Sequence, residues 1–115
     1  MSLLKVDGLQ SEVFVPITPK PVFAKVTKPL KDMKIAIVTA AGVHLKKDKP
    51  FNLAGDTSYR VVPSTATDDE LMVSHGGYDN TDVNKDINCM FPIDRLRELA
   101  DEGFIGSLAP NFYTC

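Results

Sequence analysis

The most distinct hydrophobic pattern in the chain is a short run of apolar and β-branched residues, Lys34–Ala40, which leads into the small residues Ala41 and Gly42. A continuous apolar run of this length predicts a strand that is buried on both faces of a parallel sheet. Shorter runs predict two further strands, at Ser58–Val62 and Leu71–Ser74, with a turn over residues 65–68 between them.

Phe91–Gly103 has the clearest helical periodicity, with apolar residues on one face and charged residues on the other. The apolar face consists of Ile93, Leu96, Leu99 and Ala100. Pro92 suits the first helical position, and Gly103 suits the C-terminal stop. Arg95 and Arg97 are expected to pair with carboxylates one turn away. After the helix, Phe104–Leu108 and Asn111–Tyr113 predict a final β segment.

Residues 1–33 contain Pro16, Pro19, Pro21 and Pro29, a density that restricts any strand, such as one over residues 13–15, to a sheet edge. We interpret them as an extended proline-rich arm that lies across the domain or a partner; a loose tail is the alternative. Residues 34–115 are predicted to form an α/β domain with a short, mainly parallel sheet and one flanking helix. Since one helix cannot cover both faces of such a sheet, we expect an incomplete domain.

The chain has 115 residues and a formal net charge of −2. This length suits one domain, and no basic stripe is present that could neutralise phosphates, so we expect no nucleic-acid partner. No apolar run approaches the ~20 residues that span a bilayer, and no signal-peptide pattern begins the chain. Cys89 and Cys115 form no disulfide framework. These features predict a cytoplasmic protein without a membrane span.

The loop SHGGYDN, residues 74–80, is the best candidate site, because several chemically capable side chains occur together in it. We predict that His75 and Asp79 are catalytic, since histidine is suited to proton transfer near neutral pH. The residues predicted to bind substrate in this loop are Gly76, Gly77 and Tyr78. Glycines can take positive φ and let the backbone approach a ligand. The alternative is that His75 and Asp79 only hydrogen-bond the loop to itself.

The segment TAAGVH, residues 39–44, is the second candidate, because it follows a predicted strand at the end where α/β sheets bind ligands. Gly42 is predicted to bind substrate and His44 to be catalytic, with a buried structural histidine as the alternative. We expect the two loops to form one functional surface. We predict no metal, although a site built from His44, His75 and Asp79 stays possible.

Cys89 lies among the apolar residues Ile87, Met90 and Phe91, which predict a buried, inert thiol. Its position just ahead of the predicted helix would instead favour a reactive thiol.

Two longer segments carry a family resemblance. They are GVHLKKDKPFNLAGDTSYRVVP, residues 42–63, and SHGGYDNTDVNKDINCMFPIDRL, residues 74–96. With these segments in this order, and from about Val6 onward, the chain resembles the selenoprotein B component of D-proline reductase and the related component B of glycine, sarcosine and betaine reductases. The resemblance implies that residues 34–115 are the N-terminal portion of a reductase-component domain.

The resemblance also implies a reaction, the reductive cleavage of D-proline to 5-aminovalerate in anaerobic (Stickland) amino-acid fermentation. It implies a pyruvoyl group on a partner subunit, a selenocysteine nucleophile downstream of this chain, and a dithiol or thioredoxin-like reductant. This chain is then expected to hold no cofactor, to be inactive alone, and to associate into an oligomer or complex. The alternatives are a non-catalytic interaction module and a component of glycine, sarcosine or betaine reductase.

Overall fold

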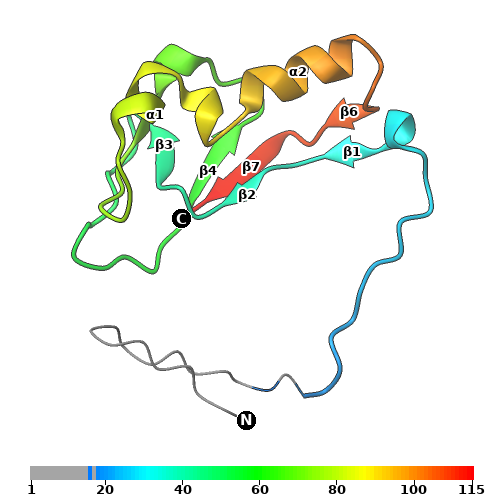
Figure 1. Cartoon of the computed structure of the whole chain (residues 1–115), viewed down its shortest axis with the longest axis horizontal. Coiled ribbons are helices and arrows are strands. Elements are labelled where there is room, and N and C mark those ends of the chain that lie inside the picture. The colour runs from blue at the N-terminus through cyan, green and yellow to red at the C-terminus, as the bar shows by residue number, and fades with distance from the viewer. Residues whose placement is uncertain (1–15, 17) are drawn as a thin grey trace.

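A computed structural model describes residue 16 and residues 18–115 of the chain. Figure 1 shows a small domain of strands and helices with an arm that leads away from it. The strands are β1 (Lys34–Ile35), β2 (Val38–Thr39), β3 (Val43–Leu45), β4 (Arg60–Pro63), β5 (Leu71–Val73), β6 (Ser107–Leu108) and β7 (Asn111–Thr114). The helices are α1 (Thr81–Lys85) and α2 (Ile93–Asp101), with the 3-10 helices η1 (Leu30–Asp32), η2 (Asp68–Glu70) and η3 (Ile87–Cys89). The predicted α/β class is confirmed.

The strand pairing is mixed. β1 pairs with β6 and β2 pairs with β7, both in parallel. β4 runs antiparallel to β7, which places β7 in the centre of the order β2-β7-β4. β3 and β5 form a separate antiparallel pair. The predicted strand Lys34–Ala40 therefore exists as β1 and β2 in parallel pairings. The strands that follow it before the helices, β3, β4 and β5, pair antiparallel.

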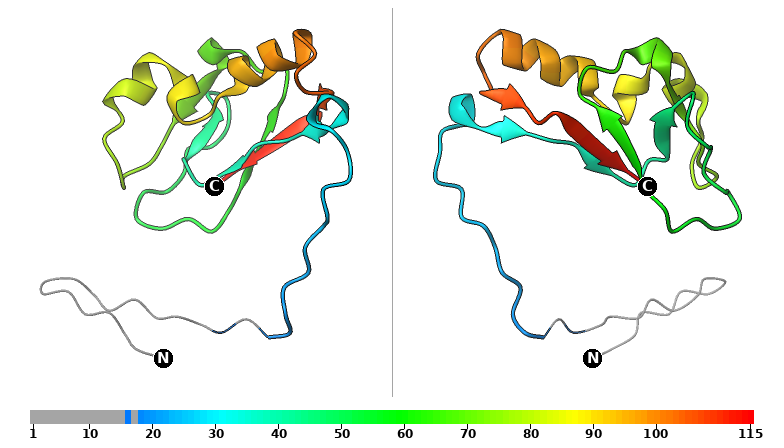
Figure 2. Two further views of the ribbon diagram at one scale, coloured as in Figure 1. Left: turned by 45° about the vertical axis from the view of Figure 1, so that its right-hand side comes forward. Right: turned by 180° about the vertical axis from the view of Figure 1, so that it is seen from behind.

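The prediction that Lys34–Ala40 is buried on both faces is wrong. Burial alternates along this segment, and Val38 is 78% exposed. α1 and α2 lie on one side of the β2-β7-β4 sheet, as Figures 1 and 2 show, so side chains that point to the other side meet solvent. Alternation of this kind is typical of a sheet with one packed face.

The core lies between this sheet and the helices. Phe91 and Phe112 are both fully buried and pack edge to face, with 5.9 Å between ring centroids. Val62 and Ile93 complete the centre of the cluster. Aromatic pairs in this geometry stabilise a core beyond the area that they bury.

The predicted helix is confirmed as α2 and is two residues shorter at each end than its pattern. Pro92 stands just before the helix, and Gly103 follows it with φ near +80°, the left-handed conformation that glycine adopts most easily. Leu99, which the pattern placed on the packed face, is 37% exposed.

The polar segment between the SHGGYDN loop and α2 is partly helical, since it contains α1 and η3. Val83 and Ile87 bury their side chains from these short elements. The Asp86 carboxylate accepts a hydrogen bond from the Asn88 backbone N–H at 3.0 Å and so starts η3. The Asp86 cap and the buried side chains of Val83 and Ile87 thus order a segment whose polar composition is typical of a loop.

The described part of the arm is exposed. Val22 and Phe23 are 98% and 85% accessible, so they do not pack across the domain. The strand considered for residues 13–15 lies outside the described residues, and the division at residue 33 stays a prediction. None of the helices formed by residues 18–115 is long and apolar enough to cross a membrane. The cytoplasmic location also stays a prediction.

Candidate functional site

A cavity of about 320 Å³ lies between the loop that precedes β4 and the loop that follows β5. Its volume is within the range of small-molecule sites. Its walls are formed by Ala40, Gly42, Phe51, Asn52, Leu53, Gly55, Asp56, Ser74, His75, Gly76, Gly77 and Cys115. The two loops that the sequence proposed as one surface therefore meet here, joined by a third loop over residues 51–56.

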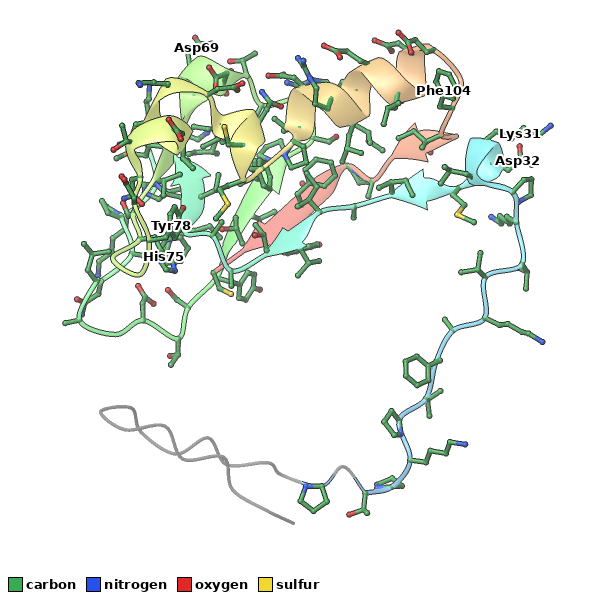
Figure 3. All side chains as sticks on the ribbon, viewed as in Figure 1. Lys31, Asp32, Asp69, His75, Tyr78 and Phe104 are labelled. Carbon is green, nitrogen blue, oxygen red and sulfur yellow. The ribbon has the colours of Figure 1, made fainter. Side chains whose placement is uncertain are left out.

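His75 is held in this cavity wall by its own loop. Its Nδ1 accepts a hydrogen bond from the Gly77 backbone N–H at 2.8 Å, so a neutral ring carries its proton on Nε2. The ring packs against Tyr78 with 4.6 Å between centroids, and Figure 3 shows the two side chains next to each other. His75 is thus an oriented, partly exposed hydrogen-bond donor beside a cavity.

Of the four glycines that line the cavity, Gly42 and Gly55 have a positive φ, near +70° and +145°. A Cβ on Gly42 would lie 2.4 Å from the Ser74 carbonyl oxygen, so this position requires glycine for both space and conformation. The expectation that Gly76 and Gly77 take positive φ is wrong. At these positions the missing side chain leaves room, which at Gly77 is filled by the His75 ring.

Tyr78 and Asp79 are not among the cavity-lining residues. The Tyr78 hydroxyl donates to the Ala41 carbonyl at 2.8 Å, and burial raises the pKa of this tyrosine. The Asp79 carboxylate accepts from the Thr81 hydroxyl and backbone N–H, and these two bonds lower the pKa of Asp79. Both side chains therefore hold the loop in shape, which is the alternative that the sequence left open for Asp79.

His44 is wholly buried in β3 and lies behind the cavity wall. Its Nδ1 is 2.7 Å from the Leu45 carbonyl oxygen and its Nε2 is 2.9 Å from the Ser74 hydroxyl. Phe51 packs edge to face against the ring at 5.8 Å. Among residues 18–115, no three metal-ligating side chains come together, so the alternative of a metal site built from His44, His75 and Asp79 finds no support.

Asp56 is the charged group in the cavity wall that the sequence did not single out. Hydrogen bonds from the Ser58 hydroxyl and from the backbone N–H groups of Asn52 and Ser58, with Arg60 3.8 Å away, lower the pKa of Asp56 to about 2. Its carboxylate is therefore ionised at neutral pH. The available signal in the sequence is FNLAGD, residues 51–56, in which a glycine stands next to a carboxylate.

Both cysteines are exposed, so the prediction of a buried Cys89 is wrong. Cys89 is at the end of η3, where Ile87 and Phe91 are buried while Cys89 and Met90 are exposed. Cys115 lines the cavity, and its backbone N–H donates to the Thr39 carbonyl at 3.0 Å.

The model of one protein family, glycine/sarcosine/betaine reductase selenoprotein B, matches residues 1–115. The D-proline reductase subunit gamma of Acetoanaerobium sticklandii is 69% identical over 108 residues, which cover 94% of this chain and 45% of that protein. The sarcosine reductase complex component B subunit beta of Peptoclostridium acidaminophilum is 36% identical, with 93% of this chain and 27% of that protein covered.

A third relative is the glycine reductase complex component B subunit gamma of Symbiobacterium thermophilum. It is 34% identical over 94% of this chain and 28% of that protein. The chain thus spans less than half the length of these relatives. No solved structure matches. The family match over the whole chain, together with these relatives, shows that the chain belongs to the glycine/sarcosine/betaine reductase selenoprotein B family.

Proposed function

We propose that this chain contributes part of the substrate site of an amino-acid reductase complex that acts on D-proline. The observation that carries this proposal is the 69% identity to a D-proline reductase subunit, against 36% and 34% for the sarcosine and glycine reductase components. Because the chain spans 45% of that relative, the activity is assigned to the assembled complex and not to the chain alone.

The reaction is the reductive opening of the proline ring. The bond between the α-carbon and the ring nitrogen breaks, and each of these atoms gains a hydrogen, so two electrons and two protons are consumed. A dithiol or thioredoxin-like partner supplies the electrons and becomes a disulfide. The pyruvoyl group of a partner subunit supplies activation of the amine, and a selenocysteine outside this chain supplies the nucleophile, as the resemblance implies.

The contribution of this chain is to position the substrate and to stabilise, by a hydrogen bond, the charge that develops on it. The apolar wall of Phe51, Leu53 and Ala40 suits the methylene groups of a five-membered ring. His75 presents Nε2–H beside this wall, and an N–H donor aimed at charge that develops in the transition state accelerates a reaction by roughly 100-fold or more.

The test is D-proline-dependent dithiol oxidation by the complex assembled with its partner subunits. His75→Phe retains a flat ring beside Tyr78 and removes both nitrogens, so it should lower kcat by roughly 100-fold. The control is Lys85→Ala, an exposed change on α1 that should leave kcat unchanged. Equal rates for wild type and His75→Phe would refute the role of His75. Turnover of glycine, sarcosine or betaine but not D-proline would move the function to that alternative reductase class.

A non-catalytic interaction module is the second candidate, and the solvent-exposed apolar face of the β2-β7-β4 sheet favours it. It predicts that every cavity variant assembles and turns over D-proline as wild type does, whereas variants of that sheet face fail to assemble.

A further inference from the structure

The hydrogen bonds of His44 fix the direction of the hydrogen bond that Ser74 makes. A neutral imidazole has one N–H donor and one acceptor nitrogen. The Leu45 carbonyl, 2.7 Å from Nδ1, can only accept, so the proton of His44 is on Nδ1. Nε2 then has only a lone pair to offer, and the Ser74 hydroxyl, 2.9 Å away, must donate its proton to it.

The Ser74 oxygen is therefore left as an acceptor at the cavity wall. A serine hydroxyl has one proton and two lone pairs, and its proton is already used on His44. Within residues 18–115, no other hydrogen bond reaches this oxygen. Ser74 lines the cavity, so its lone pairs are available to a bound molecule that carries N–H or O–H donors.

The rest of the cavity favours a positively charged donor. The Asp56 carboxylate lines the same cavity and is ionised at neutral pH. Arg60 forms a long ion pair with this carboxylate at 3.8 Å, and it also donates to the Lys49 carbonyl at 3.0 Å and lies over the Phe51 ring at 4.2 Å. A small ring that carries an ammonium N–H would place its methylene groups on Phe51 and its charge toward oxygen acceptors.

The arrangement differs from a Ser-His-Asp hydrolase site. The second nitrogen of His44 faces a neutral carbonyl, so no carboxylate is present to stabilise an imidazolium. His44 is wholly buried and cannot touch a ligand. Its effect on the cavity is exerted through Ser74 alone.

We propose that Ser74 recognises the N–H of a cyclic secondary ammonium group and that His44 is the positioning residue that keeps the Ser74 hydroxyl turned to accept. This inference rests on the proposed function for the identity of the substrate, an amino acid whose amine is part of a ring. It adds Ser74 and His44 to the proposed site. It also predicts that the site selects for an N–H group over an N-methyl group when both ligands are cations.

The experiment measures binding of two probes to the full chain by NMR titration. Pyrrolidinium has two N–H donors, and N,N-dimethylpyrrolidinium has the same charge and ring without them. Wild type should bind pyrrolidinium about 10-fold or more tightly, the effect expected of one hydrogen bond to a charged group. Ser74→Ala should reduce this ratio to about one, and Ser74→Thr, which retains the hydroxyl, should restore it.

His44→Phe tests the positioning role. Without the acceptor Nε2 the Ser74 proton is free to turn into the cavity, so the preference for N–H should fall while circular dichroism stays that of wild type. If His44→Phe does not fold, Ser74→Ala and Ser74→Thr decide the question. A ratio near one in wild type, or an unchanged ratio in Ser74→Ala, would overturn the inference.

The two proposals can fail separately. Selective pyrrolidinium binding that depends on Ser74, with no turnover of D-proline by the assembled complex, would support the amine site and remove the reductase assignment. If D-proline turnover depends on His75 and is unchanged in Ser74→Ala, the reductase assignment is supported and the amine site at Ser74 is refuted.

Discussion

At the scale of single residues, the orientation of His75 depends on an absent side chain. The ring occupies the space beside Gly77, where a Cβ would lie 2.6 Å from His75 Cε1. The same packing brings Nδ1 to the Gly77 backbone N–H. A Cβ on the neighbouring Gly76 would meet no atom within 4 Å, so the His75 ring does not require glycine at that position. Two adjacent glycines in one loop therefore have different roles.

We predict that Gly77→Ala displaces the His75 ring and that Gly76→Ala does not. Because the displaced atoms belong to a side chain that can rotate, Gly77→Ala should change the free energy of unfolding by less than about 1 kcal/mol. The chain has two histidines, so their Cε1 signals are easily separated in a carbon–proton NMR spectrum. The His75 signal should shift in Gly77→Ala alone, and equal shifts in both variants would contradict the prediction.

At the scale of elements, one arginine fastens α2 to the turn after β4. Arg97 donates to the carbonyls of Ser64 and Ala66 at 2.6 and 2.8 Å, and pairs with Asp94 at 2.5 Å. Arg95, on the same helix, pairs only with Glu98 in an exposed position. The expectation that both arginines form ion pairs one turn away is confirmed. Arg97 also donates to two backbone carbonyls, which the sequence did not indicate.

Arg97→Ala is predicted to lower the free energy of unfolding by about 1–3 kcal/mol, because it leaves two carbonyls without their charged donor. Arg95→Ala should change it by less than about 0.5 kcal/mol, since exposed ion pairs contribute little. Urea denaturation of the two variants measures the difference. Equal effects would show that the bonds to Ser64 and Ala66 do not stabilise the fold.

The elements that could be predicted from sequence were those defined by local pattern. α2 and the strands near Lys34, Leu71 and Asn111 follow from periodicity and from the proline and glycine at their ends. β3 was missed because its pairing with β5 is a long-range choice, which three residues of sequence do not specify. The cavity wall over residues 51–56 was missed for the same reason, since only the fold brings it opposite His75.

At the scale of the whole molecule, one face of the β2-β7-β4 sheet is open. Val38, Tyr113 and Val61 lie in register across the three strands, and are 78%, 43% and 40% exposed. Tyr59 packs near Tyr113, with 6.3 Å between ring centroids. Contiguous apolar side chains of this kind mark a surface that associates with another molecule.

We predict that the chain purified alone self-associates through this face and that Val38→Lys reduces the association, because it places a charge on the most exposed residue of the apolar row. Val22→Lys is the matched control, since Val22 is also exposed but lies on the arm. Light scattering across a concentration series gives the mass of each variant. A wild-type monomer, or a loss of association in Val22→Lys alone, would refute the assignment to the sheet.

The parallel pairing of β2 with β7 has a consequence for the order in which the molecule folds. β1 pairs with β6 and β2 pairs with β7, so the segment between them must fold back before those hydrogen bonds form. We therefore expect α1, η3 and α2, whose contacts are close in sequence, to form early, and β1 and β2 to join late. During synthesis on the ribosome, the edge of β2 stays unpaired until β7 has emerged. An unpaired strand edge is prone to aggregation, so we expect a chaperone to matter most in this interval.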